Sequence, residues 1–296
     1  MANTKNKDTS SENIRFSFYI NLTFAIIEII GGLLTNSLII FSNAIHDVGD
    51  SLSLGISWHL EKISKKPVSD SYTYGFKRYS LLAALISAAL ILASSFFVII
   101  EAISRLFSPP QINGKSLLIF GFLGLFFNGL AILKLLRSKS YNEKFAMLHL
   151  LDDVLGWAVV VVVSIIIMLS KNLYILDPIF STAISIYLIF IVIKNTKEVL
   201  NIFLQAVPKN MDIGKIKNVL LTIKDIKDVH DAHIWTMDGN YNVFSIHITV
   251  DKGAHTDNYN SIKKLVRASL ESCNIQHATI EICREDEFCE FNPVKN

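Results

Sequence analysis

Six apolar segments dominate this chain and limit the folds that it can adopt. They cover residues 16–34, 38–60, 80–103, 116–136, 145–169 and 175–193. A helix of roughly 20 apolar residues crosses a hydrocarbon core of about 30 Å, so each segment is long enough to span a bilayer. Only 18% of the 296 residues are charged and 51% are hydrophobic, whereas soluble domains are about 25% charged. The sequence therefore predicts an α-helical membrane protein and excludes a disordered, fibrous or disulfide-rich secreted chain.

The basic residues predict the orientation in the lipid bilayer. Lys and Arg gather in the connections 61–79 and 137–144 and directly after the sixth segment, whereas the connection 35–37 has none. Because cytoplasmic loops carry the excess of Lys and Arg, we expect both termini to be cytoplasmic. The prediction is a multi-pass protein of the cell membrane, with a cytosolic tail over residues 1–15 and a transmembrane domain of six helices over residues 16–200.

After residue 200 the pattern becomes that of a small soluble domain. Residues 211–223 and 256–272 favour helices, and residues 229–237, 241–250 and 277–283 favour strands. The order α-β-β-α-β suits a small two-layer α+β domain, predicted to be cytosolic over residues 201–296. The chain's net charge of +2 is too small for a nucleic-acid partner.

Two identical polar motifs interrupt the apolar segments. His46 and Asp50 lie in the second segment, and His149 and Asp153 lie in the fifth. Spacing of four residues places each pair on one helix face. Ionisable groups inside a bilayer cost free energy, so those that occur there usually have a function. If the two helices face each other, two imidazole nitrogens and two carboxylate oxygens converge.

This donor set suits a tetrahedral Zn²⁺ site, and other divalent ions such as Cd²⁺ or Co²⁺ would also bind. The residues alone leave two alternatives open, polar contacts between helices and a proton path without metal. Asp47 and Asp152 are either partners that orient the histidines or residues that face a wet vestibule.

Other functional signatures are absent from the sequence. It has no Gly-x-x-x-x-Gly-Lys-Ser/Thr loop for ATP and no His-Glu-x-x-His of a metalloprotease. No arrangement of Ser, His and Asp or of Cys and His suggests a nucleophile. We therefore expect a protein that is not an enzyme and that has no ATP-driven motor.

Several segments together resemble the cation diffusion facilitator family, and most closely its bacterial zinc/cadmium/cobalt efflux members. These segments are Leu-Thr-Asn-Ser at 34–37, the His46-x-x-x-Asp50 motif, Tyr-Gly-Phe-Lys-Arg at 74–78, the run at 149–157, and Val-His-Asp-Ala-His-Ile-Trp at 229–235. The resemblance implies a homodimer, a ferredoxin-like cytosolic domain, and exchange of a divalent metal for protons. It implies that the four metal ligands are His46, Asp50, His149 and Asp153. It also implies that a histidine at position 46 makes the site selective for zinc.

The same resemblance suggests a second metal site in the cytosolic domain. Its candidate ligands are His230, His247, Cys283 and Cys289, and two histidines with two cysteines suit zinc. The alternative is a packed histidine pair and two unrelated thiols. An odd number of three cysteines gives no disulfide framework, which favours a reduced, cytosolic setting.

Two functions compete at this stage. The first is a secondary transporter that exports Zn²⁺ from the cytosol in exchange for protons. Binding requires neutral His and ionised Asp, so the metal displaces protons, and alternating access to a midplane site completes the cycle. The second is a membrane-anchored metal sensor without transport, in which zinc acts only as a regulatory ion.

Overall fold

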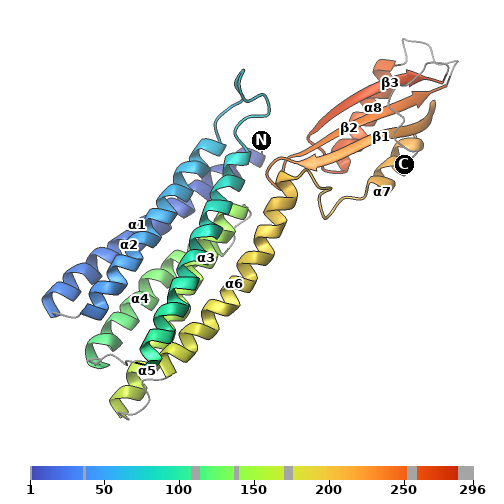
Figure 1. The fold of residues 1–296 in the computed structure, drawn as a ribbon. Helices are drawn as coiled ribbons and strands as arrows, with labels where there is room; N and C mark the ends of the chain where they lie inside the picture. The colour runs from blue at the N-terminus through green and yellow to red at the C-terminus, as the bar shows by residue number, and fades with distance from the viewer. Residues whose placement is uncertain are drawn as a thin grey trace. The chain divides into compact units, whose positions relative to one another are not determined.

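The computed structural model describes residues 2–35, 38–107, 114–136, 140–169, 176–251 and 259–285. The chain forms two compact units, Met1–Val199 and Leu200–Asn296, and Figure 1 shows a helical part and a part that contains a sheet. Each unit is described here by itself.

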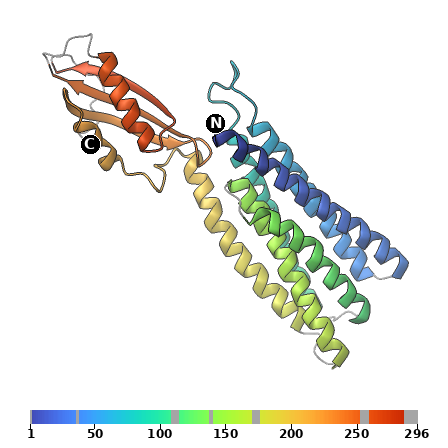
Figure 2. The same cartoon turned by 180° about the vertical axis from the view of Figure 1, so that it is seen from behind.

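The first unit consists of long helices that run up and down in succession (Figures 1 and 2). They are α1 (Ala2–Thr35), α2 (Leu38–Ser64), α3 (Arg78–Phe107), α4 (Gly114–Leu135), α5 (Tyr141–Leu169) and α6 (Leu176–Phe203), the last of which continues into the second unit. Helix α1 begins at Ala2, so the polar tail that precedes the first apolar segment is also helical.

Membrane crossing is consistent with the length and composition of these helices. Within the described ranges, four segments are long and apolar enough to cross a bilayer: Ser11–Gly31, Arg78–Phe107, Gly114–Leu135 and Tyr141–Ile166. Helices α2 and α6 have 27 and 28 residues, which also exceeds the roughly 20 residues needed. Helix α2 is less apolar than those four segments, and it carries the His46 and Asp50 motif.

The interior of the bundle is packed by aromatic side chains against small residues. Phe24 of α1 stacks on Phe127 of α4 and meets Trp157 of α5 edge-on, with ring centroids 5.5 Å apart in both pairs. Trp157 also lies directly over Gly124 of α4. Small residues that let helix backbones approach closely are typical of membrane helix interfaces.

Gly124→Ala is expected to destabilise the bundle, because a Cβ at this position would overlap the indole ring of Trp157. Overpacking of this kind costs about 1–3 kcal/mol. The matched control is Gly129→Ala on the same helix, where a Cβ meets no atom within 4 Å. Thermal unfolding in detergent should show a lower midpoint for the first variant alone, and equal midpoints for both would contradict this packing.

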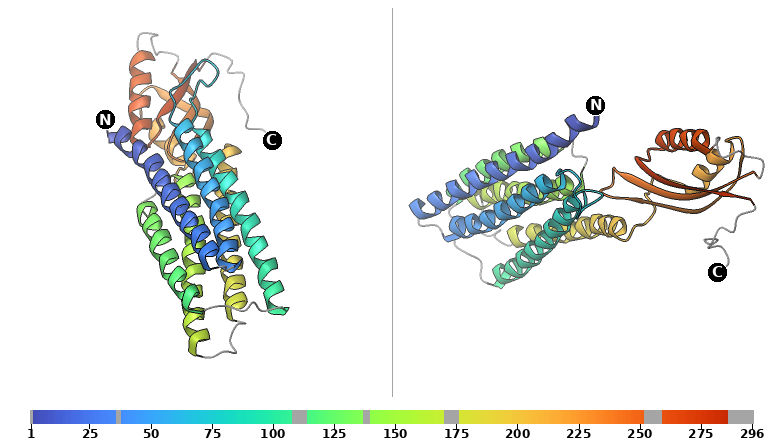
Figure 3. Two further views of the ribbon diagram at one scale, coloured as in Figure 1. Left: turned by 90° about the vertical axis from the view of Figure 1, so that its left-hand side faces the viewer. Right: turned by 90° about the horizontal axis from the view of Figure 1, so that it is seen from above.

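The second unit has two helices on one face of a three-stranded sheet. Its elements are α7 (Ile213–Leu221), β1 (Ile226–Thr236), β2 (Asn242–Val250), α8 (Tyr259–Ser272) and β3 (His277–Arg284). The sheet order is β1-β2-β3, with β1 antiparallel and β3 parallel to β2. Figure 3 shows α8 lying along the sheet that these strands form.

Apolar and polar side chains alternate along the strands, so the sheet has one face in the core and one polar face. Phe244, Ile246, Ile248 and Val250 point to the helices and pack with buried residues of α7 and α8. The intervening residues of β2, among them His247, therefore lie on the opposite face. The predicted fold class is confirmed, since the α-β-β-α-β order and the helical membrane part are both observed.

Candidate metal sites

Helices α2 and α5 bring three of the four predicted intramembrane ligands together. Asp50 of α2 lies 3.1 Å from His149 of α5, measured from Oδ1 to Nε2. One ligand atom each from Asp50, His149 and Asp153 lie within 4.8 Å of one another. Asp50 and His149 are buried, and Asp153 Oδ2 is buried without a hydrogen-bond donor in the described part of the chain. These three residues, the membrane triad, come from two helices that are distant in sequence.

The fourth predicted ligand, His46, belongs to α2, but its side chain lies outside the described residues. The backbone register nevertheless relates it to the triad. Because α2 and α5 run in opposite directions, the step from Asp50 back to His46 matches the step from His149 forward to Asp153. Both steps cover one helical turn, so His46 and Asp153 occupy equivalent levels on the two helices.

Buried polar groups of α1 surround the same region of α2. Asn21 Nδ2 donates to Ser51 Oγ at 3.3 Å and to the Asp47 carbonyl oxygen at 3.5 Å. Glu28 of α1 is fully buried, and neither of its carboxyl oxygens has a hydrogen-bond partner in the described part of the chain. Asp47 is only 4% exposed, so its side chain is buried within the helical unit.

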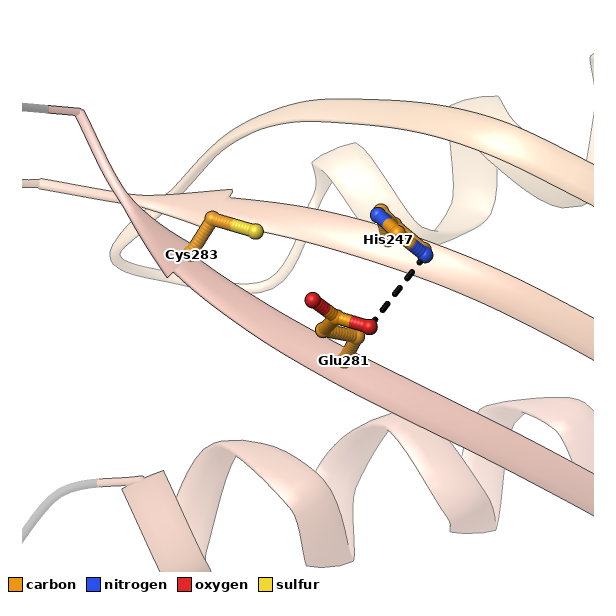
Figure 4. A group of neighbouring side chains, drawn as sticks. All are labelled: His247, Glu281 and Cys283. Carbon is orange, nitrogen blue, oxygen red and sulfur yellow. Dashed lines mark ion pairs between the residues drawn. The ribbon is translucent and has the colours of Figure 1, made fainter. Parts of the chain in front are cut away.

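A second group of possible ligands lies on the polar face of the sheet. His247 of β2 and Glu281 and Cys283 of β3 offer ligand atoms that all lie within 4.8 Å of one another. Figure 4 shows the three side chains projecting from the two neighbouring strands, with His247 Nε2 at 3.4 Å from Glu281 Oε2. The parallel register explains the cluster, since His247 is the partner of Glu281, and Thr249 is the partner of Cys283.

Sequence reasoning chose only part of this cytosolic group. Glu281 was missed, although its position two residues before Cys283 places both on one strand face. His230 pairs with His247 in the ladder, with ring centroids 5.7 Å apart, but the structure does not include it in the three-residue group. Cys289 lies outside the described residues.

An irregularity in β1 adds one more carboxylate next to His247. The register shifts between His230 and His233, and Asp231 there has a positive φ of 45°. Its carboxylate lies 2.8 Å from His233 Nε2 and 3.5 Å from His247 Nε2. Bulges often redirect side chains at functional sites, and the sequence carried no signal for this one.

Comparison with known proteins decides the family. The cation efflux transmembrane domain matches residues 14–204, and the cation efflux protein cytoplasmic domain matches residues 208–285. The chain belongs to the cation efflux family. The predicted resemblance to cation diffusion facilitators is thereby confirmed.

Relatives are similar along nearly their whole length. The cadmium, cobalt and zinc/H(+)-K(+) antiporter of Bacillus subtilis is 29% identical over 95% of this chain and 92% of its own. The metal cation efflux system protein CzcD of Cupriavidus metallidurans is 28% identical, over 92% and 86%. The zinc transporter ZitB of Escherichia coli is 26% identical, over 93% and 88%. This cation efflux protein is therefore a multi-pass membrane transporter and not an enzyme, as its missing catalytic motifs predicted.

Proposed function

We propose that this cation efflux protein exports Zn²⁺ from the cytosol in exchange for protons. The observation that carries the proposal is the membrane triad, in which two carboxylates and one imidazole meet between α2 and α5. We assign the fourth ligand to His46, because the antiparallel register places it level with Asp153. The transport site is then His46, Asp50, His149 and Asp153.

Charge and donor type both favour zinc. Two carboxylates balance the two charges of the ion, which offsets part of the cost of holding it inside a bilayer. Nitrogen and oxygen donors in a tetrahedral set fit Zn²⁺, with bonds of about 2.0–2.2 Å. The names of the relatives from Bacillus subtilis and Escherichia coli both include zinc, and Cd²⁺ and Co²⁺ remain further candidate substrates.

Proton exchange follows from the same ligands. Metal binding requires ionised carboxylates and an imidazole lone pair, so protons held by the empty site leave when the ion binds. His149 and Asp50 contact each other directly, with 3.1 Å between Nε2 and Oδ1. Zinc and protons therefore compete for the same atoms, and alternating exposure of the site to the two sides couples their movements.

Flux measurements in proteoliposomes test the proposal. A pH gradient across the vesicle membrane should drive zinc movement, and collapse of the gradient should stop it. The rival function is a membrane-anchored sensor, which would bind zinc and move none. Absence of flux from a protein that still binds zinc would reject export and favour the sensor.

For the cytosolic domain we propose a homodimer that zinc strengthens. The matched cytoplasmic family domain supports dimerisation, and the group of His247, Glu281 and Cys283 offers a regulatory zinc site. His230 and Cys289 remain candidates to complete it. Both termini and this domain are proposed to face the cytosol of the cell.

His247→Ala is expected to weaken zinc binding at this site at least about tenfold. Loss of a residue that only hydrogen-bonds to a metal ligand already lowers metal affinity by about that factor. The measurement is energy transfer between labelled cytosolic domains in the full-length protein during zinc titration. His277→Ala, an exposed histidine of the same domain, is the matched control. Identical titration curves for the parent and both variants would argue against a zinc-dependent dimer contact.

A further inference from the structure

Two turns away from the membrane triad, the interface of α2 and α5 contains a second set of polar contacts. Ser57 lies seven residues after Asp50, and Asn142 lies seven residues before His149, so both repeat on the same helix faces as the triad. Ser57 Oγ donates to Asn142 Oδ1 at 2.5 Å, and Asn142 Nδ2 donates to the Ser57 carbonyl oxygen at 3.1 Å. The two helices are thus joined a second time on the side nearer the end of α2 and the start of α5.

A buried carboxylate extends this set of contacts to a third helix. Glu61 Oε2 accepts hydrogen bonds from Asn142 Nδ2 at 3.0 Å and from Ser80 Oγ of α3 at 2.8 Å. All four residues are buried, with exposed fractions of 0% to 7%. We call Ser57, Glu61, Ser80 and Asn142 the seam network. It connects the C-terminal part of α2 with the first turns of α3 and α5.

We propose that the seam network is the cytoplasmic barrier of the metal pathway, and that its members are positioning residues that close α2, α3 and α5 between the cytosol and the membrane triad. The proposal rests on zinc export and on cytoplasmic termini. In that orientation Ser57 lies about 10 Å and Glu61 about 16 Å from Asp50 along α2 toward the cytosol, given a rise of 1.5 Å per residue.

The chemistry of the network suits a contact that opens and closes. While it is closed, Glu61 is satisfied by donors from two other helices, as a buried carboxylate must be. When the helix ends separate toward the cytosol, water can replace both donors, so the open state leaves no carboxylate unsatisfied. An apolar contact at this position would lose its packing on opening and receive no compensation from water. A zinc ion from the cytosol cannot pass while these side chains remain in hydrogen-bond contact.

Neighbouring residues show that the start of α5 is the centre of this end of the bundle. Tyr141 Oη donates to Glu198 of α6 at 3.4 Å. Glu143 Oε1 accepts from Asn13 Nδ2 of α1 at 3.1 Å. Three consecutive residues of α5 therefore contact three other helices, α6, α2 and α1, and displacement of this turn would break contacts with all three.

Single hydroxyl deletions test the barrier. Ser57→Ala and Ser80→Ala should favour the state open to the cytosol, which lowers both the KM for cytosolic zinc and the maximal rate. The expected decrease in KM is about three- to tenfold, the population change that one buried hydrogen bond can produce. Ser53→Ala is the matched control, because Ser53 Oγ donates to the Gly49 carbonyl oxygen within α2. A purely structural role would lower the rate without lowering KM, and that result would overturn the proposal.

A reversible cross-link tests whether the contact must open. The natural cysteines all lie after residue 272, so the variant with both Ser57→Cys and Asn142→Cys has the only cysteines of the helical unit. Oxidation of this variant should reduce zinc flux at least about tenfold, and reductant should restore the flux. The parent protein treated with the same oxidant should keep its flux. Unchanged flux through fully cross-linked protein would overturn the barrier. Absence of flux in the untreated parent would instead reject export itself, so the two failures are distinguishable.

Discussion

Replacing Asp50 or Asp153 with alanine is expected to reduce zinc transport at least about a hundredfold while the protein still folds. Each substitution leaves the divalent ion with half of its compensating charge between α2 and α5. An unpaired buried charge costs about 3–5 kcal/mol, and every 1.4 kcal/mol corresponds to a factor of ten. Initial zinc flux in proteoliposomes measures the loss.

The control for this experiment is Asp70→Ala, which removes an exposed carboxylate from the connection between α2 and α3. It should transport zinc at the rate of the parent. Gel filtration and thermal unfolding in detergent establish that all three variants fold. If Asp50→Ala or Asp153→Ala moves zinc nearly as fast as the parent, the membrane triad is not the transport site.

Replacing His46 with aspartate is expected to shift selectivity from zinc toward cadmium, with a change in the ratio of the two rates of about tenfold or more. The substitution converts the proposed set of two nitrogens and two oxygens into one nitrogen and three oxygens with an added negative charge. A carboxylate is shorter than imidazole and binds through one or both oxygens. The altered site therefore accepts a larger ion and a higher coordination number than the compact zinc tetrahedron.

Competition between zinc and cadmium in the same vesicles measures this ratio. His149→Asp is the matched variant, because it makes the same exchange of nitrogen for oxygen on the opposite helix. A gain of cadmium transport in the first variant alone would assign selectivity to position 46. If His46→Asp discriminates against cadmium as strongly as the parent, then packing around the site controls selectivity and the assignment is wrong.

Local patterns were sufficient to predict the helices and strands and the pairs of polar residues that share a helix face. Segment length predicts membrane helices because the hydrocarbon core of a bilayer is about 30 Å thick. Spacing of four residues predicts that His149 and Asp153 share a helix face, and alternation predicts the strands of the cytosolic domain. The helix and strand repeats are properties of the backbone, so they can be recognised in the sequence without knowing which elements pack against each other.

Contacts between segments that are distant in the sequence could be identified only in the tertiary structure. The pairing of β2 with β3 places Glu281 beside His247, and the irregularity in β1 turns Asp231 toward the same histidine. Neither is visible in the sequence, because a strand's period does not specify its partner or its register. The candidate site on the sheet was therefore predicted only in part.

The seam network illustrates the same division within the bundle. The seven-residue spacing places Ser57 and Asn142 on the helix faces of the membrane triad, but the sequence does not show that they meet each other or that Glu61 and Ser80 join them. Close packing, such as Trp157 over Gly124, sets how far one helix slides along another, and this depends on side chains from several helices at once. The sequence thus determined which helix faces are polar, whereas only the packed bundle decided that Asp50 meets His149 and that Ser57 meets Asn142.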